Sequence, residues 1–509
     1  MRFCRKILTY SRRFTLILIF LLEIALLYAV LVTRNQNLEI FNFICKIFGF
    51  FISIYIISGK KQSAYKLLWV FFILIFPILG TVSYLFMITE LPAKRLKKKY
   101  EIAAKNGIRE RGKSASSIDK LEEKLPMASS CGKYLESVSA YTVYADNQTA
   151  FYTPGEKFFN ELLYELSLAK KYIFLEYFIL SEGKMLSKVL DILKKKASEG
   201  VTVRIIYDDI GSFLTVPTNL PKHLSHYGIE CVKFNKFVPF LSSVHNNRDH
   251  RKIACIDGVV AFTGGVNIAD EYINEHERFG HWLDCGVKIK GSAAWSLAVI
   301  FLENWSLLTK SSEDFSRFLP TVIFEENTSG FVQPYADSPL DDEPVGENIY
   351  LKLINLSKNY LYICTPYLIP SENILSALKL AAKSGVKIKI ITPRKWDKWY
   401  VHLVTRSYYR ELIDSGIEIY EYSYGFIHSK IFVSDGNIAT VGTANLDYRS
   451  LFLNFECGTI LYGTETVIEI ENSINKIVEH SNKIDKSSIH SSVIARMLRA
   501  LLRIFAPLL

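Results

Sequence analysis

The sequence predicts a duplicated α/β fold, with two mixed-sheet halves and flanking helices, preceded by transmembrane helices. Three observations support this prediction: apolar residues concentrate before residue 90, a short pattern of polar residues occurs twice, and the segments around it repeat in the same order. With 509 residues, 49% of them hydrophobic, the chain can build a large core and is not disordered. Its net charge of +10 suits anionic partners: phosphates, acidic lipid surfaces or nucleic acid.

Three apolar segments near the N-terminus cover residues 14–32, 40–57 and 67–88. Each approaches the about 20 residues that a helix needs to cross a bilayer. The first follows a basic stretch but has no small-residue cleavage site, so we expect an uncleaved anchor. Glu23 interrupts the first segment and Lys46 the second, and charged residues are costly inside a membrane. The second segment is the weakest candidate span.

The distribution of basic residues complicates the orientation. One cluster precedes the first apolar segment and another, at residues 94–99, follows the third. Three spans would place these clusters on opposite sides of the membrane, which the positive-inside tendency disfavours. Either one of the three segments does not cross the membrane, or one basic cluster lies on the non-cytoplasmic side despite this tendency. We expect a multi-pass protein of the cell membrane with its catalytic portion in the cytoplasm.

Five regions follow from these patterns. Residues 1–90 are a membrane anchor with two to three transmembrane helices, 91–135 a basic tether with some helix, 136–330 the first half, 331–485 the second half, and 486–509 a C-terminal basic amphipathic helix. In the last region Arg496, Arg499 and Arg503 share one face at helical spacing. This helix lies on an anionic bilayer or docks on the protein core, and the sequence leaves both interpretations open.

The repeated pattern is DHRKIACIDG at residues 249–258 and IHSKIFVSDG at residues 427–436. A strand points alternate side chains to one face, so each histidine projects together with the lysine two positions on. Burying two unpaired cations costs several kcal/mol each, so an anion is expected between them. The matching residues are His250, Lys252 and Asp257 in the first copy and His428, Lys430 and Asp435 in the second, followed by Asn267 and Asn445.

A carboxylate stands on the strand that follows each asparagine: Asp284 in the first copy and Glu456 in the second. From this order we expect each to orient a histidine through its distal ring nitrogen. Asp257 and Asp435 have a competing structural explanation, because Asp-Gly between two β-rich runs is typical of a hairpin turn. The other histidines lack a lysine companion and are expected to be ordinary: His223, His226, His245, His276, His281, His402, His480 and His490.

The His-x-Lys-x4-Asp pattern, with a glycine-containing turn and an asparagine after it, resembles that of the phospholipase D superfamily. Two copies behind hydrophobic N-terminal segments resemble the bacterial cardiolipin synthases, and the resemblance covers nearly the whole chain. It implies two phospholipase D-like halves that share an active site at a pseudo-twofold axis. It also implies reversible transfer of a phosphatidyl group from one phosphatidylglycerol to another, which gives cardiolipin and glycerol through a phosphohistidine.

The resemblance assigns roles that the residue types can perform. One histidine attacks phosphorus and the other transfers protons, with a slight preference for His250 as the nucleophile. The pattern names Lys252, Lys430, Asp257 and Asp435 as catalytic as well. Both lysines can neutralise the phosphate oxygens, and Asn267 and Asn445 can donate hydrogen bonds to them. No metal and no cofactor is expected, because the lysines supply the positive charge.

The eight cysteines show no zinc-ligand spacing, and Cys255, Cys364 and Cys457 are expected as buried thiols. The expected partners are phosphatidylglycerol and cardiolipin in an anionic bilayer. Nucleic acid is not expected, since its binding favours basic and aromatic surfaces without lipid anchors. The oligomeric state and the acyl-chain preference stay open.

Three other functions compete with the transferase. With water as the acceptor the same residues would make a phospholipase D-type hydrolase, and with another alcohol a different phosphatidyltransferase, such as one that makes phosphatidylserine. A non-catalytic membrane scaffold is disfavoured because no histidine or lysine of the pattern is missing.

Overall fold

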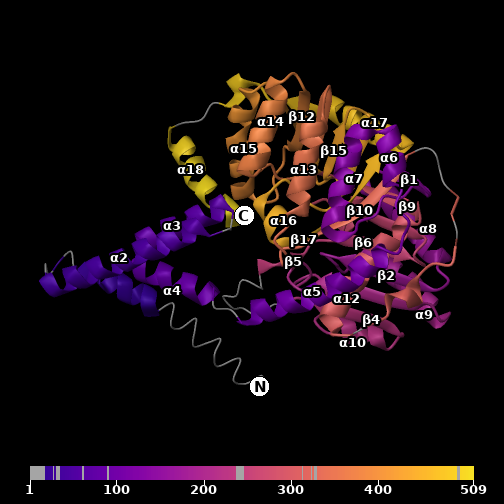
Figure 1. Cartoon of the computed structure of the whole chain (residues 1–509), viewed down its shortest axis with the longest axis horizontal. Coiled ribbons are helices and arrows are strands. Elements are labelled where there is room, and N and C mark those ends of the chain that lie inside the picture. The colour runs from indigo at the N-terminus through magenta and orange to yellow at the C-terminus, as the bar shows by residue number, and fades with distance from the viewer. Residues whose placement is uncertain are drawn as a thin grey trace. The chain divides into compact units, whose positions relative to one another are not determined.

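A computed structural model describes residues 18–26, 28–29, 32, 35–59, 62–88, 91–236, 246–311, 313–322, 324–325, 330–489 and 493–508. Residues 14–17, 27, 30 and 31 of the first apolar segment, the basic residues before it, His245 and His490 lie outside this part of the chain. The chain divides into two compact units (Figure 1). The first comprises Met1–Leu96, Phe237–Asn246 and Ala500–Leu509, and the second Lys97–Lys236 and Asn247–Arg499.

The second apolar segment forms helix α2 (Gln36–Ser58), which is the strongest candidate for a membrane span rather than the weakest. Within the described ranges it is the one helix that is long and apolar enough to cross a bilayer. Its 23 residues give a length of about 34 Å, against about 30 Å of hydrocarbon. The helix begins after Asn35, whose side chain accepts a hydrogen bond from the backbone N–H of Asn37.

The third apolar segment is broken into two helices, α3 (Ser63–Ile75) and α4 (Pro77–Ile88). Pro77 cannot donate the backbone hydrogen bond that would continue α3, and Phe76 leaves the helical conformation. Glu23, a flaw in the first segment by sequence, is buried at this break. Its carboxylate accepts hydrogen bonds from the N–H groups of Ile78 and Leu79, at 3.0 and 2.9 Å, and so caps the start of α4.

Helices α3 and α4 fold back on each other as a hairpin. The rings of Trp69 and Tyr84 lie 5.4 Å apart, and a Cβ added at Gly80 would lie 2.8 Å from the Cα of Ile73. In one continuous helix these pairs would be separated by about 22 and 10 Å. The prediction of a single span over residues 67–88 is therefore wrong.

The second unit contains two large mixed sheets with the same strand order. In the first sheet the order is β1-β9-β7-β6-β2-β3-β4, and in the second it is β10-β17-β16-β15-β11-β12-β13-β18, with β5 beside β17. The strands of the first are β1 (Asn147–Tyr152), β2 (Tyr172–Tyr177), β3 (Thr202–Asp208), β4 (Ile229–Phe234), β6 (Lys252–Ile256), β7 (Val260–Gly264) and β9 (Gly286–Gly291). Those of the second are β10 (Phe331–Asp337), β11 (Tyr360–Cys364), β12 (Lys387–Pro393), β13 (Glu418–Tyr422), β15 (Ile431–Ser434), β16 (Ile438–Gly442), β17 (Asn454–Tyr462) and β18 (Ser481–Lys483), together with β5 (Arg248–Asp249). The identical order confirms the duplicated α/β fold.

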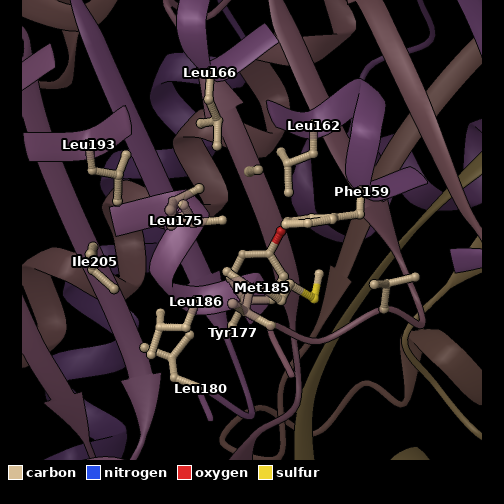
Figure 2. Close-up of a cluster of buried hydrophobic side chains, with 14 of the residues drawn as sticks. Phe159, Leu162, Leu166, Leu175, Tyr177, Leu180, Met185, Leu186, Leu193 and Ile205 are labelled. Carbon is tan, nitrogen blue, oxygen red and sulfur yellow. The ribbon is translucent and has the colours of Figure 1, made fainter. Parts of the chain in front are cut away.

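Helices cover the sheets as the apolar patterns of the sequence require. The main ones are α8 (Gly155–Leu168), α9 (Lys184–Ser198), α12 (Ala293–Thr309), α13 (Val345–Leu356), α14 (Glu372–Lys383), α15 (Trp399–Ile413) and α17 (Glu465–Glu479). Figure 2 shows the core of the first half, where Leu175 of β2 and Ile205 of β3 belong to one cluster with Leu162 of α8 and Met185 of α9. The middle strands are apolar on both faces because helices pack on each side of a parallel sheet.

Residues 97–135 are not a tether. They belong to the second unit through α5 (Leu91–Arg111), α6 (Ile118–Lys124) and α7 (Pro126–Ser139). The buried side chain of Arg111 forms an ion pair of 3.0 Å with Glu303 of α12, and Leu121 and Leu135 are fully buried. At the other end of the chain, α18 (Val493–Ile504) lies within the region of the predicted C-terminal helix, residues 486–509, and leaves Met497 and Leu501 exposed.

Candidate functional site

Both histidines of the repeated pattern lie at the carboxyl ends of parallel strands. Strand β6 runs antiparallel to β2, with Lys252 opposite Tyr177, so His250 stands just beyond the end of β2. In the second half β15 runs antiparallel to β11, with Ile431 opposite Cys364, and His428 takes the matching place. This edge of an α/β sheet is where loops commonly form binding sites.

Two short inter-half strand pairings bring the histidines into one site. Strand β5 pairs with β17, and the N–H of His250 donates to the carbonyl of Phe455 at 2.9 Å. Strand β14 (Gly425–Ile427) pairs with β8 (His281–Leu283), and the N–H of His428 donates to the carbonyl of Leu283 at 2.8 Å. Each histidine therefore lies beside the carboxylate-bearing strand of the opposite half.

The carboxylates contact the histidines across the two halves. Both oxygens of Glu456 lie 3.0 Å from Nδ1 of His250, and Oδ2 of Asp284 lies 2.7 Å from Nδ1 of His428. Each of these hydrogen bonds to Nδ1 crosses between the halves. A carboxylate at Nδ1 fixes the ring orientation and leaves Nε2 for chemistry.

The two lysines are buried next to the histidines. Lys252 Nζ donates to the backbone carbonyl of His250 at 2.6 Å, and Lys430 Nζ donates to that of His428. Burial lowers the pKa of Lys252 to about 7 and that of Lys430 to about 8, although the charge of Glu456 opposes the effect on both. An incoming anion would favour their charged forms, because opposite charges close together stabilise each other.

Burial also keeps the imidazoles neutral. It lowers the pKa of His250 to about 4 and that of His428 to about 3, with the carboxylates opposing the change and the lysines reinforcing it. Lys430 acts on His250 as well as on His428, and Lys252 acts on both in the same way. Charges from the two halves therefore meet in one electrostatic environment. A neutral imidazole at neutral pH has the free lone pair that a nucleophile or general base needs.

Aromatic rings line the site. The ring of Phe178 lies 5.1 Å from that of His250, and Lys252 Nζ lies 5.5 Å above the same phenylalanine. Near His428 the rings of Trp282 and Tyr272 stand at 5.2 and 5.5 Å. Such a low-dielectric wall strengthens the charge interactions at the histidines.

The two asparagines differ. Asn267 accepts from the N–H of Ile179 at 3.0 Å and donates to the hydroxyl of Tyr272 at 2.7 Å, so both ends of its amide have protein partners. Asn445 is buried, and its amide oxygen has no hydrogen-bond partner among the described residues. Its side chain also hydrogen-bonds with the carboxylate of Asp447, so the amide as a whole is not unpaired.

Asp257 and Asp435 are not near the histidines. Each sits in the hairpin turn at the far end of β6 or β15, about 20 Å of strand away. Their backbone φ angles are 55° and 51°, and their carboxylates accept three backbone N–H groups each. The donors are Lys170, Lys171 and Tyr172 for Asp257, and Lys358, Asn359 and Tyr360 for Asp435. The catalytic assignment of these aspartates is corrected: they tie the hairpin to the start of the neighbouring strand.

Sequence reasoning missed several residues that hold the site. Thr443 donates to Oε2 of Glu456 at 2.5 Å, and Asn454 donates to Oε1 at 3.2 Å. In the first half the position of Thr443 is taken by Gly265, where an added Cβ would overlap the carboxylate of Asp284. The alignment of TGGVN with VGTAN, in which a glycine faces a threonine, already contained this difference.

The segment around His250 carries charged residues that the matching segment around His428 lacks. Arg251 donates to the carbonyl of Glu456 at 3.3 Å, and Asn304 donates to both Glu176 and Asp249. Burial raises the pKa of both carboxyls, and that of Asp249 rises well above its usual value.

In the described part of the chain no group of three or more histidine, cysteine or acidic residues is arranged to hold a metal ion.

Three comparisons with known proteins show the family and the fold of the chain. The family model of the cardiolipin synthase PLD-like domain matches residues 162–283 and 350–478, and the phospholipase D-nuclease N-terminal model matches residues 47–87. A cardiolipin synthase of Geobacillus thermodenitrificans is 34% identical over 93% of this chain and 95% of its own. An uncharacterised protein of Streptococcus mutans is 37% identical over 90% of this chain and 99% of its own. The crystal structure of a phosphatidylserine synthase from Haemophilus influenzae shares the fold, with a TM-score of 0.58 at 15% identity over 75% of this chain and 98% of that one.

Proposed function

The chain belongs to the PLD-like cardiolipin synthase family, and we propose that it transfers a phosphatidyl group from one phosphatidylglycerol to another. The products are cardiolipin and glycerol, and the reaction is reversible. The observation that carries the proposal is the crossed pair of contacts, His250 with Glu456 and His428 with Asp284. Two imidazoles held in this way supply a nucleophile and a proton carrier for one phosphodiester.

The first step forms a phosphatidyl-enzyme. The negative charge of the bound phosphodiester favours protonation of the second histidine at Nε2, while its Nδ1–H stays on its carboxylate. Nε2 of the first histidine attacks phosphorus, the bond from phosphorus to the glycerol oxygen breaks, and the second histidine donates its Nε2 proton to that oxygen and becomes neutral. Glycerol then leaves. In the second step the glycerol hydroxyl of another phosphatidylglycerol gives its proton to the second histidine and attacks phosphorus. The phosphorus–nitrogen bond breaks, and the first histidine is restored.

Lysine and asparagine side chains stabilise the charge on the phosphate oxygens. Lys252 and Lys430, buried and close to both imidazoles, are placed to balance negative charge in a medium of low dielectric constant. In this proposal Asn267 and Asn445 exchange their present protein partners, Tyr272 and Asp447, to donate amide N–H groups to the phosphate oxygens. Glu456 and Asp284 act as positioning residues, because they contact the histidines and not the lipid.

The broken third segment supports a membrane placement with two crossings. Helices α3 and α4 have 13 and 12 residues, about 18–20 Å each, and are too short to cross separately. As a hairpin they enter and leave the bilayer on one side, whereas α2 and the first apolar segment cross it. Two crossings put both basic clusters on the cytoplasmic side, in agreement with the positive-inside tendency. Protease added outside sealed vesicles that contain the full chain tests this arrangement: only inside-out vesicles should lose the catalytic portion.

The full-length protein in phosphatidylglycerol liposomes tests the reaction. It should release free glycerol and accumulate a four-chain lipid, and His250→Ala and His428→Ala should each abolish both products. Phosphatidic acid as the sole product would instead assign a hydrolase. Equal turnover by either alanine variant, with folding verified, would overturn the shared site.

A further inference from the structure

We propose that two loops, residues 209–217 and 394–399, form a docking rim that inserts into the surface of an anionic phospholipid bilayer. We call them the apolar loop and the basic loop. The proposal rests on the proposed function, since it assumes that both substrates reach the histidines from a bilayer.

The two loops occupy equivalent places in the duplicated fold. The apolar loop follows β3 and the basic loop follows β12, which are the middle parallel strands of their sheets. Both loops therefore leave the sheets at the edge where His250 and His428 lie. Their sequences, DIGSFLTVP and RKWDKW, do not resemble each other, so the duplication alone does not explain their composition.

The apolar loop exposes large hydrophobic side chains. Leu214 is 90% exposed, and Ile210 and Phe213 are exposed as well. The loop is held firmly: Ser212 accepts from the N–H of Leu180 at 2.9 Å, and Thr215 donates to the carbonyl of Leu180 at 2.6 Å. A rigid loop that leaves leucine in water is typical of a surface that becomes buried elsewhere.

That loop also contacts the wall of the site. The hydroxyl of Ser212 donates to the carbonyl of Phe178 at 3.3 Å, and the ring of Phe178 lies against His250. Leu214 is therefore two positions along the chain from Ser212, which contacts Phe178 beside His250.

The basic loop combines tryptophans with cations. Trp396 and Trp399 are 50% and 54% exposed, and Arg394, Lys395 and Lys398 are exposed beside them. Tryptophan prefers the headgroup level of a bilayer, and lysine and arginine are attracted to anionic lipids. Phosphatidylglycerol and cardiolipin are both anionic, so the charge of this loop complements the proposed substrates.

The basic loop is tied to the site of the second half. Asp397 accepts from the hydroxyl of Tyr367 at 2.5 Å, and Lys398 Nζ lies 5.5 Å above the same ring. Tyr367 contacts Phe426, whose ring stacks near His428. The apolar loop thus contacts Phe178, which lies beside His250. The basic loop contacts Tyr367, which in turn contacts Phe426 beside His428.

His250 and His428 are buried in the protein, which explains why the docking rim is needed to bring lipid substrates to them. Both residues are only 7% exposed, yet a phosphodiester that carries two acyl chains has to reach them. Removing such chains from the bilayer into water is unfavourable by the hydrophobic effect. Apolar and tryptophan side chains at the bilayer surface shorten the path that the phosphate travels while the chains stay in lipid.

Insertion is measured with the full-length protein in vesicles that contain brominated phosphatidylglycerol. Bromine quenches tryptophan fluorescence on contact, so the double variant Trp396→Phe, Trp399→Phe should lose a quenched component that the wild-type protein shows. This readout does not need turnover, so it stands even if the proposed reaction fails. Equal quenching of the wild-type protein and the double variant would overturn insertion of the basic loop.

Turnover provides the second readout, with a matched control. Leu214→Asp should slow transfer between lipids in vesicles by about tenfold or more and leave transfer between short-chain, monomeric phosphatidylglycerol unchanged. Leu380→Asp, at a leucine of α14 that is 65% exposed, should change neither rate. Equal rates for the two variants on vesicles, or an equal loss by Leu214→Asp on monomeric lipid, would overturn the role of the apolar loop. Absence of any transfer by the wild-type protein would count against the proposed function instead.

Discussion

Glu456, from the second half of the chain, holds Nδ1 of His250, from the first half, with both carboxylate oxygens at 3.0 Å. His428 and Asp284 form the reciprocal contact at 2.7 Å. Because each histidine depends on the opposite half for its orientation, neither half contains a complete site. The shared site therefore requires both copies of the duplicated half.

Replacing Glu456 by glutamine should lower kcat by about 10²–10⁴-fold, because the amide no longer stabilises a positive charge on His250. The KM for phosphatidylglycerol should change little, since the carboxylate does not contact the lipid. Initial rates of cardiolipin formation check this, with Glu372→Gln at an exposed position of α14 as the control. An effect on KM alone would contradict a positioning role.

Gly265→Ala should reduce activity at least tenfold, because the new methyl group would displace the carboxylate of Asp284 from His428. Thr443→Ser, the matching position in the other half, keeps the hydroxyl that donates to Glu456 and should retain most activity. Steady-state rates and thermal unfolding of both variants provide the comparison. Full activity of the alanine variant would argue against the Asp284–His428 contact.

Asp257→Ala and Asp435→Ala should destabilise the fold while leaving the chemistry intact. Each change removes the acceptor of three backbone N–H groups, at a cost of about 1–3 kcal/mol in the free energy of unfolding. Asparagine should be tolerated better than alanine, because it adopts a positive φ more readily. Denaturant unfolding and the rate per folded molecule separate the two effects. A large loss of kcat without loss of stability would restore a catalytic role.

The value of kcat/KM should fall on the alkaline side. The protonated lysines stabilise the phosphate, and burial lowers the pKa of Lys252 to about 7 and of Lys430 to about 8, so their charge is lost as the pH rises through this range. Lys252→Arg should move the alkaline decline upward, because arginine stays charged. An unchanged profile in that variant would contradict the assignment to Lys252.

Much of the site was predictable because its residues form a local pattern. The spacing of His250 and Lys252, and its second copy, indicated which side chains share a face of a strand. The order of the chain also pointed to Asp284 and Glu456 as partners of histidines. Which carboxylate faces which histidine was not predictable, because it depends on β5 pairing with β17 about 200 residues away in the sequence.

Other features needed the structure for different physical reasons. A family pattern that includes Asp257 does not say whether the residue binds substrate or backbone, and the hairpin turn decides for backbone. The third apolar segment looked continuous by hydropathy, yet Pro77 ends the helix and Glu23, remote in sequence, caps the next one. The expected tether is packed because Arg111 finds a buried partner in Glu303, which no local pattern reveals.

The most direct test of the shared site is the covalent intermediate. The full-length protein, mixed with phosphatidylglycerol and quenched by denaturant within the first turnover, should carry a phosphatidyl group on His250 or on His428, identified by mass spectrometry of its peptides. Replacing the modified histidine by alanine should remove both the adduct and glycerol release. Cardiolipin formation with no adduct on either histidine, or with an adduct on a residue outside this pair, would contradict the account.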